Sequence, residues 1–194
     1  MQIRSFQNSD ISEASRLAKL TWGNFYTHES SELQALIYSF MVEYYNLNRE
    51  YSFSIIEGGL KGLILAFKKS DKYEGDFTKK VQSLDDKKEQ KIASDLFDYL
   101  EACGREVKSL MEENDVMLGL FVSIQKGCGK LLLARLNEVC RASGIKSVYL
   151  WTDTTCDCDY YQKNNFDLCK EKEVCVNGKV IRMLVYRKKV EFEQ

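Results

Sequence analysis

The feature that most constrains the fold of this chain is an apolar segment that leads through two glycines into a leucine-rich segment. Residues 116–122 read VMLGLFV, an uninterrupted apolar run that is typical of a buried strand. The sequence continues as SIQKGCGKLLL, and apolar side chains then recur at helical spacing from Leu132 to Cys140. We therefore predict a strand end, a glycine loop and a helix start, in that order.

A glycine loop at the start of a helix can hold an anion. The first turn of a helix has unpaired N–H groups and a partial positive charge. Gly127 and Gly129 would let the backbone approach a ligand closely, and Lys126 and Lys130 would add positive charge. The spacing fits neither the GxxxxGK[ST] loop nor the GxGxxG fingerprint. On its own the pattern leaves two interpretations open, a phosphate cradle and an ordinary tight turn.

The rest of the chain supplies further strands and helices. Gly58-Gly59 and Asn177-Gly178 each separate two strand-like runs and predict tight hairpins, and Gly144 is placed to end the helix after the glycine loop. The segment 68–114 predicts one or two amphipathic helices, with Gly104 as the break between them. The expected strands are 2–6, 51–57, 60–67, 116–122, 145–152, 166–176 and 179–188, and the other expected helices are 11–21, 30–45, 130–143 and 158–164.

Size and charge exclude several classes of protein. The 194 residues fit one domain, and 28 Lys and Arg against 29 Asp and Glu leave a net charge of −1, so no overall basic field favours nucleic acid or an anionic membrane. The first residues, MQIRSFQNSD, lack the apolar core of a signal peptide, and no apolar run approaches the roughly 20 residues of a membrane span. We expect a cytoplasmic protein without nucleic-acid or membrane partners, either a monomer or a homodimer.

The cysteines do not form an obvious framework. There are 7 of them, an odd number without the regular spacing of a disulfide scaffold, and we expect them to be mostly reduced. Cys156 and Cys158 form a Cys-x-Cys pair, but a zinc site needs two more ligands, and the only histidine, His28, lies far away in sequence. We therefore expect no metal, and a redox role of the pair stays open.

Two segments carry a resemblance to a known family. The segments VMLGLFVSIQKGCGKLLLARLNEVC and IKSVYLWTDTTCDCDYYQKNNF, together with the order of the surrounding elements, resemble the GNAT superfamily of N-acetyltransferases. The two small residues of that family's Q/R-x-x-G-x-G/A motif align with Gly127 and Gly129, and Ile124 stands where Gln or Arg is usual. In the second segment Tyr161 and Phe166 keep the family's spacing.

The resemblance implies the fold and the cosubstrate. It implies a single α/β (α+β) domain over residues 1–194, with a central mixed, mostly antiparallel sheet flanked by helices. The helical insertion 68–114 then lies between the third and fourth strands. The implied cosubstrate is acetyl-CoA, with the strand holding the pantetheine arm and the loop holding the pyrophosphate. The residues implied in cofactor binding are Leu120, Phe121, Val122, Gln125, Lys126, Gly127, Cys128, Gly129, Lys130, Thr154 and Tyr161.

The resemblance also implies the reaction. An amine attacks the thioester directly, and the protein's main tasks are positioning and electrostatic stabilisation. Tyr161 is the candidate general acid that protonates the departing thiolate, whereas its neighbour Tyr160 is expected in the core. The strand before the loop has no acidic residue, so Asp153 is the candidate base, with His28 as an alternative, acting directly or through a water.

Two functions from different classes remain open at this point. The first is an N-acetyltransferase that acts on a primary amine of a small molecule or peptide, with the insertion 68–114 shaping the acceptor site. The second is a non-catalytic protein that keeps the fold and binds coenzyme A as a sensor or interaction module. The missing strand carboxylate and the altered loop motif keep the second possibility in consideration.

Overall fold

A computed structural model describes residues 1–176 and 179–191 of the chain. Within these ranges a seven-stranded sheet runs in the order β1-β2-β3-β4-β5-β7-β6. The contact between β4 and β5 is parallel, and the other neighbours pair antiparallel. The strands are β1 Gln2–Ser5, β2 Phe53–Ile56, β3 Leu60–Lys68, β4 Val116–Ser123, β5 Ser147–Asp153, β6 Asp167–Val176 and β7 Lys179–Lys189.

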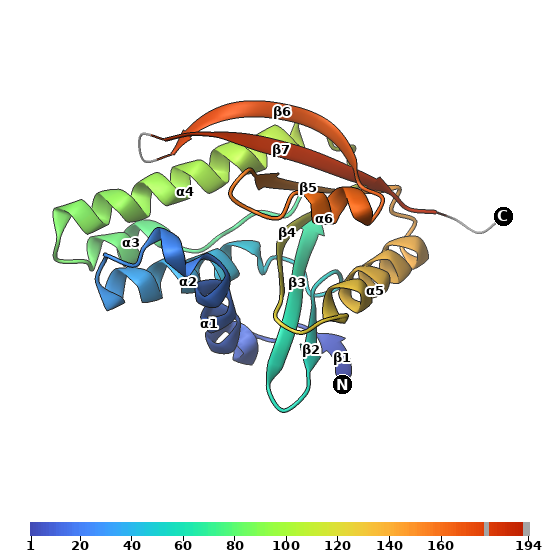
Figure 1. The fold of residues 1–194 in the computed structure, drawn as a ribbon, viewed down its shortest axis with the longest axis horizontal. Coiled ribbons are helices and arrows are strands. Elements are labelled where there is room, and N and C mark those ends of the chain that lie inside the picture. The colour runs from blue at the N-terminus through green and yellow to red at the C-terminus, as the bar shows by residue number, and fades with distance from the viewer. Residues whose placement is uncertain (177–178, 192–194) are drawn as a thin grey trace.

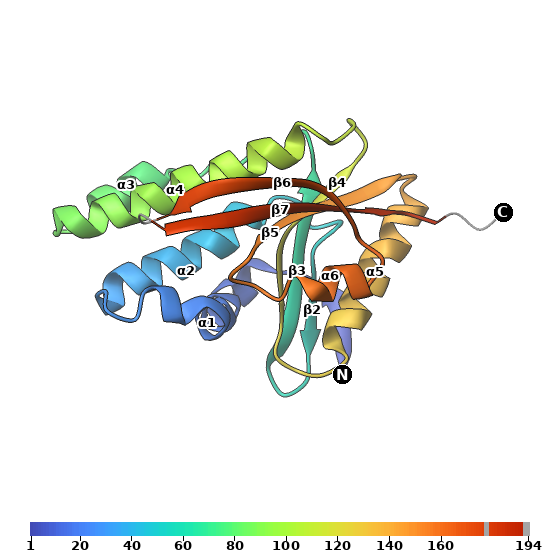
Figure 2. The same cartoon turned by 45° about the horizontal axis from the view of Figure 1, so that its top comes forward.

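Helices cover both faces of the sheet. Figures 1 and 2 show α1, α2, α3 and α4 together on one side, with α5 on the other side and the strands β6 and β7 arching over α4. The helices are α1 Ile11–Trp22, α2 Ser31–Tyr45, α3 Phe77–Gln82, α4 Lys87–Lys108, α5 Cys128–Ala142 and α6 Asp159–Lys163, and two short 3₁₀ helices cover Asn8–Asp10 and Gly23–Phe25. None of these helices is long and apolar enough to cross a membrane.

The apolar side chains form two clusters, one on each face of the sheet. The larger cluster joins α1, α2 and α4 to the sheet, because their buried residues recur at helical spacing, as Ala14, Leu17 and Ala18 do in α1. The smaller cluster lies under α5, which contributes Leu132 and Leu136. We call these sides the α4 face and the α5 face. The fold is thus the predicted mixed, mostly antiparallel sheet flanked by helices.

Local sequence signals explain most of the boundaries. Helix α2 begins where the Ser30 hydroxyl accepts a hydrogen bond from the Leu33 N–H at 3.0 Å. The predicted hairpin at Gly58-Gly59 is confirmed, since both glycines have positive φ between β2 and β3. Gly144 ends α5 with φ +70°, as expected, and Asn165 adopts φ +63° before β6.

Two details of the helices differ from the prediction. Gly104 does not break the insertion, because α4 runs through it to Lys108 and the glycine lies buried against α2, where a Cβ would be 3.7 Å from the Tyr44 hydroxyl. The actual break precedes α4, where Asp86 caps the new helix. Helix α5 begins at Cys128, earlier than its apolar periodicity suggests. The predicted Asn177-Gly178 turn lies outside the described residues, although β6 and β7 pair antiparallel up to it.

A bulge and a fork distinguish the middle of the sheet. Leu65 and Ala66 of β3 pair with Leu120 and Leu118, so Gly119 is an extra residue in β4. Pairing between β4 and β5 covers three positions, from Val116 with Val148 to Leu118 with Leu150. Beyond them the strands part, and we call the segments 119–123 and 151–153 the two arms of the fork.

Candidate functional site

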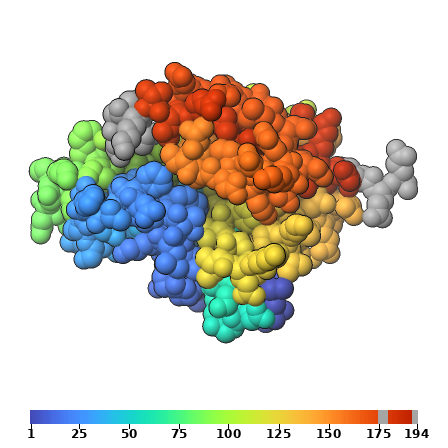
Figure 3. Space-filling model, in the orientation of Figure 1, coloured from blue at the N-terminus to red at the C-terminus, as the bar shows by residue number. Residues whose placement is uncertain are grey.

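The fork opens directly onto the glycine loop. Strand β4 keeps its pairing with β3 as far as Ser123, and β5 keeps its pairing with β7 as far as Asp153, so each arm is held on its outer side alone. Inner backbone groups of parted strands lack sheet partners and can bind a ligand. Figure 3 shows the yellow surface of the loop and of α5 between the blue α1 and α2 and the orange α6.

The loop presents free backbone N–H groups. Gly127 has φ +89°, which glycine adopts without strain, and it precedes α5 without a side-chain cap. Cys128 N–H bonds to Gln125 and Leu131 N–H bonds to Gly127, but within the described residues the N–H groups of Gly127, Gly129 and Lys130 have no hydrogen-bond partner. These are the orphan donors expected at a helix start, and they point to an anion.

The side chains of the loop differ in whether they are free to contact a ligand. Lys126 and Lys130 are exposed and form no ion pair with any other described residue. The Gln125 side-chain amide donates a hydrogen bond to Glu57 at 2.7 Å. It therefore does not replace the Gln or Arg that is usual at the position of Ile124. Cys128 is buried in the core under α5, which suits a packing role for its side chain.

Tyr160 of α6 closes one side of the loop. A Cβ at Gly129 would lie 2.8 Å from the Tyr160 hydroxyl and 3.2 Å from the Phe121 ring, so a larger residue there would press on both. The Tyr160 hydroxyl oxygen is buried and has no hydrogen-bond partner among the described residues. The prediction that Tyr160 is a core residue is wrong, because the residue is half-buried and its hydroxyl lies beside the loop.

Tyr161, the next residue of α6, packs against the apolar cluster of the α5 face instead of the loop. Its ring packs edge-on against Phe166 and lies tilted on Tyr186, with centroid distances of 5.8 and 5.7 Å. Burial raises the pKa of Tyr161 well above its ordinary value, and the nearby thiols of Cys156 and Cys158 add to this. Tyr161 is protonated at neutral pH, as an unshifted tyrosine also is, and its raised pKa makes it a weaker acid than an exposed tyrosine.

Asp153 ends the β5 arm and is held from two directions. Its side chain is 8% exposed. The Tyr99 hydroxyl from α4 donates to Oδ2 at 3.0 Å, and the Thr155 N–H donates to Oδ1 at 2.8 Å, with the Thr155 hydroxyl as a third donor. A carboxylate offers about four lone-pair positions, so one acceptor position remains for a water or an amine.

The other predicted cofactor residues are distributed along the fork. Leu120 and Val122 face the α4 side, and Phe121 faces the α5 side. Thr154 follows the β5 arm and bonds to the backbone of Arg182 in β7, at 3.0 Å through its own N–H. The fork thus brings 120–122 and the loop residues 125–130 into one region, whereas Thr154 is tied to the neighbouring strand and His28 is exposed between α1 and α2.

A pocket of about 590 Å³ lies beside α6 and β7. Cys156 and Cys158 line it together with Asp157, and the Cys158 thiol donates to the Asp153 carbonyl at 3.1 Å. Burial raises the pKa of Cys158, which disfavours its thiolate. Among the described residues, no three potential metal-ligating side chains come together.

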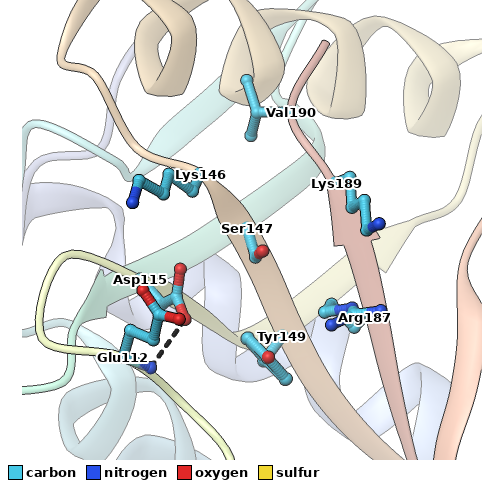
Figure 4. Close-up of a pocket in the computed structure, with 8 residues that line it drawn as sticks. All are labelled: Glu112, Asp115, Lys146, Ser147, Tyr149, Arg187, Lys189 and Val190. Atoms are coloured by element: carbon cyan, nitrogen blue, oxygen red, sulfur yellow. Dashed lines mark hydrogen bonds between the residues drawn. The ribbon is translucent and has the colours of Figure 1, made fainter.

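A smaller pocket of about 310 Å³ lies at the paired end of β4 and β5, away from the fork. Figure 4 shows Asp115 beside Glu112 on one side of β5 and Arg187 and Lys189 of β7 on the other. The Glu112 N–H donates to Asp115 at 2.7 Å, and burial raises the pKa of Asp115. No glycine loop or helix start opens onto this pocket, so the fork remains the candidate site.

Three residues on the α4 face of the fork were not predicted from the sequence to belong to the site. Tyr45 ends α2, Tyr99 lies within α4 and Trp151 lies on the β5 arm. Each sits in a segment whose helical or strand pattern accounts for its apolar character. The rings of Tyr99 and Trp151 meet because the insertion folds onto β5, and Tyr45 belongs to the same apolar cluster; no local motif predicts these contacts.

Solved structures resemble this chain along nearly its whole length. The C-terminal condensation domain of Ebony in complex with beta-alanyl-dopamine has a TM-score of 0.69 at 13% identity, covering 97% of this chain and 98% of that one. The ribosomal-protein-S18-alanine N-acetyltransferase from Escherichia coli has a TM-score of 0.56 at 8% identity, covering 100% and 96%.

An aminoglycoside 6'-N-acetyltransferase complexed with coenzyme A has a TM-score of 0.57 at 14% identity, covering 100% of this chain and 99% of that one. No protein-family model matches the sequence, and no curated protein matches it. At these identities the likeness concerns the fold. The chain thus has the fold of the GNAT acetyltransferases.

Proposed function

We propose that this chain is a GNAT N-acetyltransferase that transfers the acetyl group of acetyl-CoA to a primary amine of a small molecule or peptide. The observation that carries the proposal is the fork of β4 and β5, which opens onto a glycine loop with unpaired N–H groups. The acetyltransferases among the structures of like fold support it. A cytoplasmic location and a monomeric or homodimeric state are part of the proposal.

The residues of the loop fit the pyrophosphate of coenzyme A. The N–H groups of Gly127, Gly129 and Lys130 are unpaired donors at the positive end of α5. The absence of a side chain at Gly129 lets Tyr160 and Phe121 pack against that turn, and the exposed Lys126 can add charge from the loop. The arm 120–122 then offers its inner backbone groups to the amides of the pantetheine arm.

The remaining steps belong to side chains at the fork. Acetyl-CoA supplies the acetyl group as an activated thioester. Asp153 accepts the proton of the amine through a water, using the acceptor position that Tyr99 and Thr155 leave. Tyr161 on α6 protonates the departing thiolate, and Tyr160 contacts the cofactor beside Gly129.

The acceptor is proposed as an amine of low molecular weight or a peptide terminus. One structure of like fold holds beta-alanyl-dopamine, and others act on a ribosomal-protein alanine or an aminoglycoside. The carboxylate of Asp153 suits a cationic amine better than an anionic acceptor. The non-catalytic alternative keeps the cofactor site and lacks turnover.

A binding measurement followed by a turnover screen tests the proposal. Calorimetric titration with acetyl-CoA and with coenzyme A should show saturable binding to the wild-type chain. A thiol-release assay over a panel of primary amines should then show turnover that depends on the amine. Binding of both ligands without turnover on any amine would favour the non-catalytic alternative. Absence of binding by either ligand would exclude both.

A further inference from the structure

We propose that Tyr45 and Trp151 form a pair of hydrogen-bond donors that holds the carbonyl oxygen of the acyl group in the fork. The inference rests on the proposed function, because it assigns the ligand of two groups at the same site. It adds a side-chain contact from α2 and from β5, on the α4 face, to the backbone contacts proposed above. Three observations support it: burial of the donors, their lack of partners, and their position.

Tyr45 is fixed across the fork. It is 2% exposed, and its ring lies so close to the bulge that a Cβ at Gly119 would be 2.2 Å from its Cδ1 atom. The ring also stacks on Phe67, at 6.2 Å between centroids, and meets Tyr44 edge-on at 4.9 Å. Despite this enclosure, its hydroxyl oxygen has no hydrogen-bond partner among the described residues.

Trp151 brings a second buried donor to the same place. It is the first residue of β5 beyond the pairing with β4, and its ring packs edge-on against Tyr99 at 5.4 Å. Its indole nitrogen is buried and also lacks a partner among the described residues. Burial raises the pKa of Tyr45, and a weak contact from the Trp151 indole N–H opposes part of that rise, which places the two groups near each other although their geometry falls short of a hydrogen bond.

The chemistry of the pair selects the ligand. An indole N–H can only donate, and a phenol donates readily, so the ligand must accept hydrogen bonds, which excludes an ammonium group. Glu101 lies near enough to Tyr45 to raise its pKa, and Asp153 follows Trp151 by two residues, so a permanently charged anion is disfavoured. A carbonyl oxygen accepts hydrogen bonds and is neutral in the bound thioester, so it meets both conditions.

Buried donors without partners are rare in native proteins, which is why their ligand is worth seeking. The fork is also where the thioester of a bound cosubstrate must meet the amine, since pairing of β4 and β5 stops there. In this position the pair would stabilise the oxygen as charge develops on it, and catalysis commonly depends on such donors. A trapped water is the competing occupant.

Isotope-edited infrared spectroscopy of bound acetyl-CoA, labelled with ¹³C at the acetyl carbonyl, tests the pair without any amine present. In the wild-type chain the carbonyl band should shift to lower frequency relative to free acetyl-CoA. In Tyr45→Phe and in Trp151→Phe part of this shift should be lost, and affinity for acetyl-CoA should fall about 3- to 10-fold. Affinity for coenzyme A, which lacks the carbonyl, should stay unchanged.

Tyr38→Phe is the matched control, because Tyr38 is a buried tyrosine of the same helix whose hydroxyl already bonds to the Trp22 carbonyl at 3.2 Å. It should leave the carbonyl band in place. Thermal unfolding checks that each variant is folded. If the carbonyl band of bound acetyl-CoA lies at the wild-type frequency in both Tyr45→Phe and Trp151→Phe, the two residues do not bind the carbonyl oxygen. A trapped water would then be their partner. Failure of the wild-type chain to bind either ligand would refute the proposed function itself.

Discussion

The two faces of the fork are built differently. On the α5 face the site is a continuous piece of chain, from the β4 arm through the loop 124–127 to the start of α5, with free N–H groups and exposed lysines. On the α4 face it is assembled from α2, α4 and β5, and its polar atoms, those of Tyr45, Trp151 and Asp153, are buried in the larger core. The first face suits a charged, mobile cosubstrate, and the second suits a small group held in a fixed position.

This difference between the faces shows that the helical insertion 68–114 contributes to the site. Helix α4 packs against β5 and sends Tyr99 to Asp153, and its last turns are tied to β6 through Glu106. The insertion is therefore part of the site rather than an appendage of the sheet. A variant of one face should change mainly cofactor affinity, and a variant of the other should change mainly turnover or stability.

The neighbouring tyrosines of α6 have the largest expected effect, and they mark where this division ends, because both lie on the α5 face. Tyr161→Phe should lower kcat by about 100-fold or more, the usual contribution of a general acid, with little change in affinity for acetyl-CoA. Tyr160→Phe should weaken acetyl-CoA binding several-fold with little change in kcat, since its hydroxyl lies beside Gly129. Steady-state kinetics and titration of both variants separate the effects. The reverse pattern would move the acid role to Tyr160.

Gly119 tests how tightly the α4 face is packed. A Cβ there would lie 2.2 Å from Tyr45 and 2.8 Å from the Phe67 ring, so Gly119→Ala must displace one of two enclosed rings. We expect a loss of about 2 kcal/mol in the free energy of unfolding, measured by urea denaturation. Gly23→Ala is the control, because its nearest neighbour is 3.7 Å away. Equal stability of the two variants would show that the fork tolerates movement of Tyr45.

The sequence predicted the α5 face better than the α4 face, for a physical reason. The glycine loop, Gly144 and the Gly58-Gly59 hairpin are local features, whose turn chemistry is visible in neighbouring residues. Tyr45 and Trp151 meet through tertiary packing, which leaves no periodic or motif signal. Gly104 misled the prediction because a single glycine costs a helix only about 1 kcal/mol, which the packing of the rest of α4 on the core outweighs.

The lysines of the loop test the α5 face. Replacing Lys126 and Lys130 together by Ala should weaken coenzyme A binding about 10-fold at low ionic strength, with a smaller difference in added salt, because exposed charges are screened. Lys87→Ala, at the exposed start of α4, is the matched control and should leave affinity unchanged. Calorimetric titration at two salt concentrations measures both effects. An affinity unaffected by the loop lysines would leave the N–H groups as the sole pyrophosphate contacts.

The smallest effect concerns the ion pairs that tie α4 to β6. Lys170 at 2.6 Å and Lys172 both bind Glu106, and their hydrogen bonds lower its pKa from 4.5 to about 2. Because the pKa is lower in the folded chain, this stabilisation is fully present above pH 4.5 and is lost as the pH falls towards 2. The groups are largely solvated, so we expect Glu106→Gln to cost only about 0.5–1 kcal/mol at pH 7.

Urea denaturation of wild type and Glu106→Gln from pH 7 down to pH 3 measures this contribution, and the gap between them should narrow steadily below pH 4.5. Glu138→Gln is the matched control on the α5 face, where Glu138 pairs at 2.8 Å with one described cation, Arg135, on an exposed helix surface. It should change stability less, since a single exposed pair contributes little. A gap for Glu106→Gln that persists unchanged to pH 3 would mean that its side chain holds α4 through packing instead of charge.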